Sequence, residues 1–189
     1  MKIKDCVFLD RDGVINQDSP DYITCWAEFH FIPGSLNAIA RLTRSGLAVI
    51  VITNQSVINR QMVDLTTLEA MHRQLRQAVC DGGGRITDIF HCPHRPDEGC
   101  GCRKPKPGLI FAARDRYGID LSRAVMVGDS VKDIRAGQAA GCKRTVLVQT
   151  GNGMTATQTL EQTGQSPDHV AADLDRAARW ILDQRRMPG

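Results

Sequence analysis

Two aspartates lie one residue apart, directly after an apolar run near the start of the chain. Residues 7–9 are Val-Phe-Leu, and Asp10, Arg11, Asp12 and Gly13 follow. Carboxylates this close repel each other, and burying them costs free energy unless a partner compensates their charge. Side chains two residues apart on an extended segment point the same way, so Asp10 and Asp12 can address one ligand. The pair therefore predicts a chemical site.

Polar residues also follow two later apolar runs, and two cations precede a helical pattern. Thr53 and Asn54 follow the run at 48–52. Asp129 follows the run at 124–127 after Gly128, with Asp133 four residues further on. The two cations are Arg103 and Lys104, before the helical pattern at 109–117. One reaction uses all these groups: a carboxylate attacks phosphorus, and a second acid protonates the leaving oxygen and then activates water. A hydroxyl and a lysine hold the phosphoryl oxygens. The pattern predicts a phosphohydrolase in which Mg²⁺ compensates the crowded carboxylates.

Each group has a simpler explanation when taken alone. The two aspartates near the start, or Gly128-Asp129, could belong to turns, and Thr53-Asn54 could be a strand-to-loop turn. Lys104 could be a solvated loop lysine among other basic residues and prolines. Their joint occurrence at the ends of expected strands favours one shared site.

Four candidate metal ligands gather in residues 92–108, a segment rich in proline and glycine. One residue separates Cys92 from His94, and one separates Cys100 from Cys102. Three thiolates and an imidazole suit tetrahedral Zn²⁺, and a site filled by four protein ligands is structural. Such an ion would rigidify a loop that holds few apolar residues. The segment therefore predicts a zinc loop.

Other interpretations of this loop remain. The thiols could form a disulfide or stay unrelated, although a reducing cytoplasm disfavours the disulfide. His91 could replace His94 as a ligand, but the strand expected before Cys92 would turn His91 away. The loop ends at Arg103 and Lys104, so a bound ion would place both cations beside the phosphate.

Short apolar runs alternate with helical patterns along the chain, which indicates a doubly wound α/β sheet. Runs rich in Val and Ile predict buried parallel strands at 6–9, 48–52, 86–90, 124–127 and 145–148. Helical patterns cover 35–45, 65–80, 109–117, 133–140 and 174–184. Residues 149–168, rich in Gly, Thr and Gln, predict a surface loop. In such sheets the active site lies beyond the carboxyl ends of the strands.

Length and composition narrow the class of protein. The 189 residues suit one domain, residues 1–189. A net charge of +3 and an aromatic content of 5% do not favour nucleic acid or an anionic membrane as partner. No apolar run approaches the roughly 20 residues that span a bilayer, and the start lacks a signal-peptide pattern. We expect a cytoplasmic monomer that acts on a small molecule.

The sequence resembles the haloacid dehalogenase (HAD) superfamily of phosphohydrolases. Its four signatures occur in order as DRDGV at 10–14, TN at 53–54, RKP at 103–105 and GDSVKD at 128–133. The resemblance implies that Asp10 is the nucleophile and Asp12 the acid and base. It further implies that Mg²⁺ is held by Asp10, the backbone carbonyl of Asp12, and Asp129, with support from Asp133. Thr53 and Lys104 would then bind the transferring phosphoryl group.

The cysteine loop narrows the resemblance to one branch of that superfamily. It is similar to the loop of HAD enzymes that remove the 7-phosphate of D-glycero-D-manno-heptose 1,7-bisphosphate, and histidinol-phosphate phosphatases share it. The stretches FLDRDGVINQDSPDY, FIPGSLNAIARL, VITNQS and LVQTGNG favour the heptose branch, which supplies lipopolysaccharide core precursors. This resemblance implies that Arg103 contacts the sugar or the second phosphate. It also implies a substrate pocket lined by Asp18, Tyr22, Asn54 and Gln55.

One loop departs from the pattern of that branch. Its members usually carry S-G-x-A-R-G after T-N-Q, whereas here Val57 and Gln61 replace both glycines. Neither side chain adopts positive φ as cheaply as glycine, so we expect a different loop shape. Residues 14–47 and 56–103 leave no room for a separate cap domain. We therefore expect an open site surrounded only by loops.

Three other functions compete with the heptose bisphosphatase. The first is hydrolysis of another small phosphate such as histidinol phosphate. The second is removal of a 3′-phosphate from nucleic-acid ends, which stacking aromatics would support. The third is a non-enzymatic phospho-accepting domain, and Asp12 argues against it because such domains usually lack this second acid.

Overall fold

Six parallel strands form the centre of the computed structural model, which describes residues 2–186. The strand order is β3-β2-β1-β4-β5-β6. The strands are β1 (Cys6–Leu9), β2 (Ala48–Asn54), β3 (Asp88–Cys92), β4 (Ala124–Gly128), β5 (Arg144–Val148) and β6 (His169–Ala171). The helices are α1 (Ser35–Arg44), α2 (Leu65–Asp81), α3 (Gly108–Tyr117), α4 (Val131–Ala140), α5 (Gly153–Gln162) and α6 (Leu174–Arg186). Short 3₁₀ turns are η1 (Trp26–Glu28), η2 (Pro96–Glu98) and η3 (Leu121–Arg123).

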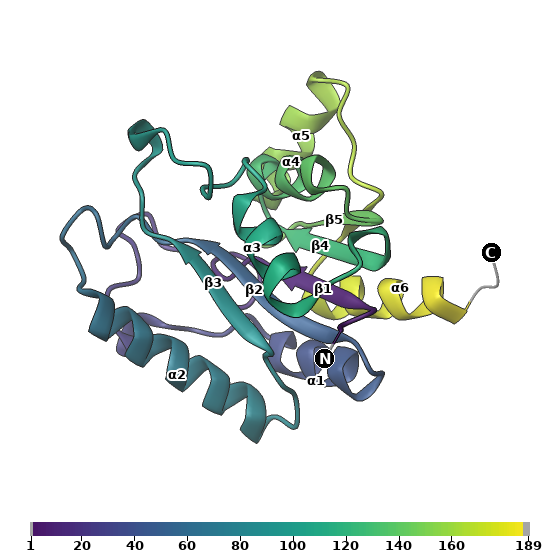
Figure 1. Ribbon diagram of the computed structural model, residues 1–189, viewed down its shortest axis with the longest axis horizontal. Helices are drawn as coiled ribbons and strands as arrows, with labels where there is room; N and C mark the ends of the chain where they lie inside the picture. Colours follow the sequence, from purple (N-terminus) through teal and green to yellow (C-terminus); the bar gives the residue numbers. More distant parts are fainter. Residues whose placement is uncertain (1, 187–189) are drawn as a thin grey trace.

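Helices cover both faces of the sheet, with α1, α2 and α6 on one side and α3, α4 and α5 on the other (Figure 1). The strands are apolar on both faces, and their successive side chains alternate between two buried clusters. In β1, Val7 and Leu9 join the cluster of α1, α2 and α6, whereas Phe8 joins that of α3 and α4. This two-sided burial confirms the doubly wound α/β class expected from the sequence.

The order of the strands brings their carboxyl ends to one edge of the sheet. β1 lies between β2 and β4, with Leu9 in register with Val51 and with Val127. The backbone N–H of Asp10 still donates to the carbonyl of Val127, at 3.0 Å. The polar residues that follow these three strands are therefore neighbours in space.

The structure corrects the prediction for residues 149–168. They are not a continuous surface loop, because α5 occupies residues 153–162. Ala156 and Leu160 of α5 pack on Ile134 and Leu147 in a small cluster of their own. Gly153 and the Thr residues of α5 are weak helix formers, so tertiary packing rather than local propensity decides this helix.

Smaller differences lie at other boundaries. The third strand runs over Asp88–Cys92, two residues later than the expected 86–90, and β6 follows as a three-residue strand that the sequence did not predict. The four other expected strands lie within the observed ones, and the five expected helices agree to within two residues at each end. None of the helices in residues 2–186 is long and apolar enough to cross a membrane.

Candidate functional site

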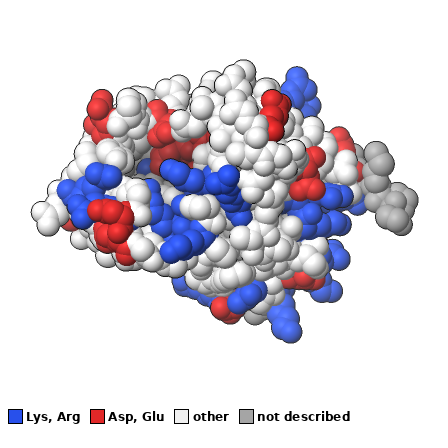
Figure 2. All heavy atoms as spheres, turned by 90° about the horizontal axis from the view of Figure 1, so that it is seen from above, with Lys and Arg blue, Asp and Glu red and all other residues white. Residues whose placement is uncertain are grey.

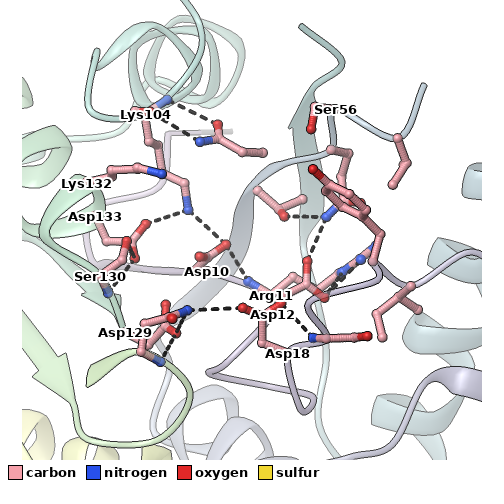
Figure 3. A pocket seen from close by; sticks show the side chains of 18 of the residues that line it. Asp10, Arg11, Asp12, Asp18, Ser56, Lys104, Asp129, Ser130, Lys132 and Asp133 are labelled. Carbon is pink, nitrogen blue, oxygen red and sulfur yellow. Dashed lines mark hydrogen bonds and ion pairs between the residues drawn. The ribbon is translucent and has the colours of Figure 1, made fainter. Parts of the chain in front are cut away.

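The side chain of Asp10 lies beside a buried lysine at the carboxyl end of β1. Lys104 Nζ is 2.8 Å from Asp10 Oδ1 and 2.6 Å from Asp133 Oδ1. Only 3% of Lys104 is exposed, so its two carboxylate partners compensate a cation that burial would otherwise disfavour. Figure 3 shows Lys104 between these two aspartates at one side of the pocket. The ammonium is in position to hold an oxygen atom bonded to Asp10.

Three carboxylates crowd together at this end of the sheet. One oxygen from each of Asp10, Asp129 and Asp133 lies within 4.8 Å of the others. Burial is the main cause that raises the pKa of Asp129 to about 6, and Asp133 raises it further. Burial likewise raises the pKa of Asp10, although Lys104 opposes the shift. Such a cluster of carboxylate oxygens fits a divalent cation with a preference for oxygen ligands, such as Mg²⁺.

Glycine backbones surround the carboxylate of Asp129. Gly13 has φ +79° and Gly151 has φ +56°, and a Cβ atom at either would collide with that carboxylate. The backbone N–H of Asn152 donates to Asp129 Oδ2 at 2.8 Å, and the Thr150 hydroxyl donates to the Gly13 carbonyl at 2.6 Å. The loop after β5 therefore packs on the loop after β1 and fixes the carboxylate of Asp129.

The carboxylate of Asp12 has a different set of partners. Arg11 Nη2 lies 2.9 Å from Asp12 Oδ1, Asn16 donates to Oδ1 at 2.8 Å, and Gln55 donates to Oδ2 at 2.8 Å. Burial alone would raise the pKa of Asp12, but the charge of Arg11 and these hydrogen bonds hold it below its usual value. The side chain of Asp12 is not part of the three-carboxylate cluster.

The last two residues of β2 and the residue after it connect the two sides of the site. Gln55 Nε2 donates to Thr53 Oγ1 at 2.8 Å as well as to Asp12. Asn54 Oδ1 accepts from the backbone N–H of Lys104 at 3.1 Å, and its amide donates to the Lys104 carbonyl at 3.2 Å. Asn54 therefore fixes the backbone that carries Lys104, while Thr53 lies in the pocket with only 1% of its surface exposed.

The structure brings the four ligands of the expected zinc loop together. Cys92 Sγ is 3.5 Å from His94 Nδ1, and Cys102 Sγ is 3.4 Å from the same nitrogen. The three sulfur atoms lie 3.2–3.7 Å apart, and all four ligand atoms lie within 4.8 Å of one another. A tetrahedral Zn²⁺ with bonds of about 2.3 Å to sulfur needs sulfur separations of about 3.7 Å. The donor set and its spacing fit zinc.

His91 points elsewhere, as expected for the residue before a ligand on a strand. Its ring lies 5.8 Å from the ring of His72, on α2. All seven cysteines are free thiols in the structure, so no disulfide competes for the four-ligand cluster. These positions agree with His94 as the nitrogen ligand.

A cavity of about 390 Å³ opens above the three-carboxylate cluster, and Asp12, Lys104 and the polar residues at the end of β2 also line it. Asp18 accepts from the amide of Asn152 at 3.0 Å, and the guanidinium of Arg103 donates to the carbonyl of His94 at 2.9 Å. Tyr22 is 37% exposed at the rim. The structure thus places every residue of the expected substrate pocket on its wall.

Known proteins share this fold and are similar to this sequence over most of its length. A family model described as HAD-hydrolase-like matches residues 101–177. D-glycero-beta-D-manno-heptose-1,7-bisphosphate 7-phosphatase of Pseudomonas aeruginosa is 52% identical over 78% of this chain and 83% of its own length. The Pseudomonas putida protein of the same name is 47% identical over 93% of this chain and 98% of its own. This chain belongs to the HAD-family heptose-bisphosphate phosphatases.

A solved structure of this heptose-bisphosphate phosphatase family has the same architecture. The D,D-heptose 1,7-bisphosphate phosphatase of Bordetella bronchiseptica, complexed with magnesium and phosphate, superimposes with a TM-score of 0.89. It is 43% identical to this chain, and the match covers 95% of this chain and 99% of the other. The family resemblance inferred from the four signatures is confirmed.

Several pocket residues were missed by the sequence analysis. Arg60, Lys132, Ser130 and Asn152 line the cavity. They lie within stretches that were compared with the family, GDSVKD, LVQTGNG and the loop after TNQ, but no role was predicted for them. Arg11 was noted only as the residue between two aspartates, yet it is 1% exposed. Its burial depends on α2 and on the aromatic residues before α1, which are distant in sequence.

The loop that lacks the family's two glycines keeps part of the expected shape. Gln61 adopts φ +56°, the left-handed conformation that glycine would take more easily. Val57 has no positive φ and is instead 2% exposed in the main core. The expected change in the shape of this loop is therefore limited. Gln61 accepts the backbone strain of a positive φ, and Val57 adds buried apolar surface.

Proposed function

We propose that this protein removes the 7-phosphate of D-glycero-D-manno-heptose 1,7-bisphosphate by way of an aspartyl-phosphate. One observation carries the proposal: full-length relatives that bear this activity in their name are up to 47% identical over 98% of their length. The grouping of Asp10, Lys104 and Asp129 supports the phosphatase chemistry. The relatives named for the beta anomer favour that anomer as substrate. Such a reaction serves the supply of activated heptose for lipopolysaccharide core.

The side chains divide the reaction into two steps. A carboxylate oxygen of Asp10 attacks phosphorus, and the bond from phosphorus to the sugar oxygen breaks. The negative charge of the bound phosphate favours the protonated form of Asp12, which gives its proton to that oxygen. Asp12 then takes a proton from the water that attacks the aspartyl-phosphate, and Asp10 is released. Lys104 and Thr53 hold the phosphoryl oxygens throughout, and Gln55, which contacts both Asp12 and Thr53, keeps the acid beside the phosphate.

Two metal ions belong to this proposal. Asp10, Asp129 and the backbone carbonyl of Asp12 would hold Mg²⁺, with Asp133 fixed behind them by its bonds to Ser130 and Lys104. When bound, Mg²⁺ supplies positive charge that offsets the repulsion between carboxylate and phosphate. Zn²⁺ would be held by the four ligands of residues 92–102 and would act only on the loop's structure.

A substrate comparison tests the proposal. The protein with Mg²⁺ is given both anomers of heptose 1,7-bisphosphate, histidinol phosphate, and a 3′-phosphorylated oligonucleotide, and kcat/KM is measured from phosphate release. We expect the beta bisphosphate to give the highest value by at least about tenfold, which corresponds to about 1.4 kcal/mol. A higher value for histidinol phosphate or for the oligonucleotide would contradict the assignment.

Three further expectations complete the proposal. We propose that residues 1–189 act as one domain, that the protein is a monomer, and that it works in the cytoplasm. The ends of that range, residue 1 and residues 187–189, lie outside the described residues. Support comes from the single sheet shared by all strands and from seven free thiols, which suit a reducing compartment. A light-scattering mass near 20.8 kDa would agree with the monomer, and a doubled mass would contradict it.

A further inference from the structure

The cavity holds more positive charge than one phosphoryl group requires. Lys104 is paired with Asp10 and Asp133, and Arg11 is paired with Asp12. Three other cations line the same cavity, and none has a carboxylate partner within residues 2–186. They are Arg60, Arg103 and Lys132. Unpaired cations on the wall of one cavity favour a ligand with a second anionic group.

These cations lie at different places around the cavity. Figure 3 draws Lys132 beside Lys104, next to the carboxylates, and Ser56 on the opposite side of the pocket. Arg60 belongs to the Ser56 side, because its Nε is 3.4 Å from Ser56 Oγ. The guanidinium of Arg103 already donates a hydrogen bond to the His94 carbonyl within the zinc loop. Arg60 is therefore the unpaired cation on the side of the pocket away from the reacting phosphate.

The guanidinium of Arg60 is also held in a defined direction. It lies over the ring of Tyr22, with 5.4 Å between the guanidinium carbon and the ring centroid. Such stacking leaves the edge of the guanidinium free for a phosphate, which it can contact with two N–H groups. Because Tyr22 comes from the loop after β1, this contact joins two walls of the pocket.

The backbone under Arg60 is fixed as well. The N–H of Arg60 donates to the Ser56 carbonyl at 2.9 Å, and Val57 is buried in the core. On the other side, the amide of Asn59 donates to Glu98 Oε2 of the zinc loop at 2.7 Å. The loop that replaced the family's glycines is thus attached both to the core and to the zinc loop.

We infer that Arg60, stacked on Tyr22, binds the distal phosphate of the substrate, which the enzyme does not remove, and so determines selection of bisphosphates over monophosphates. The inference rests on the proposed function and assigns one residue of the site to the second phosphate. Arg60 is a specificity residue here and takes no part in proton or phosphoryl transfer.

The test compares two substrates in three variants. kcat and KM are measured for heptose 1,7-bisphosphate and for heptose 7-phosphate with the unmodified protein, Arg60→Gln, Arg60→Lys and the control Arg85→Gln. Arg85 is an exposed arginine that precedes β3, at the opposite edge of the sheet. We expect Arg60→Gln to lower the bisphosphate-to-monophosphate ratio of kcat/KM by about 10- to 100-fold, mainly through KM. Arg60→Lys should keep part of the ratio, and Arg85→Gln should keep all of it.

A second readout does not depend on turnover. The product, heptose 1-phosphate, should occupy the distal site, so its dissociation constant, measured by isothermal titration calorimetry, should rise about tenfold or more in Arg60→Gln. An unchanged ratio, or an equal loss for both substrates, would overturn the assignment of Arg60 while the proposed function stands. If the unmodified protein hydrolysed neither heptose phosphate, the proposed function would fail and the inference would fail with it.

Discussion

At the scale of single residues, the site separates two neighbouring carboxylates into different environments. Asp10 lies among other carboxylates and its pKa is raised by burial, whereas Asp12 is bound by Arg11, Asn16 and Gln55 and its pKa is lowered. A bound Mg²⁺ would favour the ionised form of Asp10 that a nucleophile needs, so the proposed roles follow from the neighbours of each acid and not from these two shifts. Asp10 also lies 2.8 Å from Lys104, the cation proposed to bind phosphate, and unlike Asp133, at 2.6 Å but fully buried, it lines the open end of β1.

Replacing the nucleophile tests this division. Asp10→Asn should lower phosphate release by about 10³-fold or more, because an amide does not form the acyl-phosphate. Mass spectrometry after rapid acid quench should find an added phosphoryl group on the unmodified protein and none on the variant. Asp115→Asn, which alters an exposed acid on α3, serves as the matched control. Turnover by Asp10→Asn at the unmodified rate would contradict the assignment.

The sequence was sufficient to predict that most of the residues proposed to react lie together. Asp10, Thr53 and Asp129 each lie at or just after the end of an apolar strand, and parallel strands bring such ends together. The partners of Asp12 could not be predicted in the same way. Arg11 contacts His72 on α2 at 3.5 Å and lies 5.6 Å from the Phe29 ring, and no local pattern specifies these contacts.

At the scale of elements, the zinc loop connects β3 to α3 and carries Lys104 at its end. Cys92 is the last residue of β3, and its carbonyl accepts from the backbone N–H of Gln55 at 2.7 Å. The loop therefore begins on the sheet beside Gln55 and, near its end, carries Lys104, the lysine proposed to bind phosphate. The ligand spacing predicted this loop, because four ligands in eleven residues leave few ways to arrange them.

Removal of one ligand should affect both stability and activity. Cys100→Ser should lose the bound zinc and lower the Tm by about 6–12 °C, as expected for a loss of about 3 kcal/mol in a chain of this size. Activity should fall too, because Lys104 lies on the same loop. Zinc per chain is measured by atomic absorption after dialysis. Cys80→Ser, an exposed thiol on α2, is the control, and equal zinc in all three proteins would refute the assignment.

The edge strand β3 is joined to two helices through a single carboxylate. Asp88 accepts from Tyr117 of α3 at 2.7 Å and from Arg76 of α2 at 2.8 Å. Burial by itself would raise the pKa of Asp88, but these bonds and the Ile89 N–H hold it below its usual value. The group thus stabilises the fold when it is ionised.

This gives a prediction with a definite sign. Because the folded pKa of Asp88 is depressed, its stabilisation is fully present above the unfolded pKa, near 4, and is lost as pH falls through the folded value. Asp88→Asn should therefore cost about 1–3 kcal/mol at pH 7, and less below about pH 4. Urea unfolding of the unmodified protein and of Asp88→Asn at several pH values measures this difference in the free energy of unfolding. A difference that grew on acidification would contradict this account.

At the scale of the whole molecule, one sheet and its two helical layers carry an uncovered site. Within residues 2–186 no separate cap domain lies over the cavity, as the short connections of the sequence predicted. Most of the face seen in Figure 2 is uncharged, and Lys and Arg form patches across its middle that are larger than those of Asp and Glu. This distribution suits a small anionic substrate that reaches the site from solution. The sequence did not predict α5, whose stability depends on packing against distant residues.

The uncovered cavity has a consequence for protein engineering. With no hinged cover to reshape, preference for one phosphorylated molecule over another depends on the side chains of short rim loops. A library confined to the loops around Tyr22 and Arg60 could therefore redirect the catalyst toward new metabolites. The buried strands and the reacting aspartates would remain untouched.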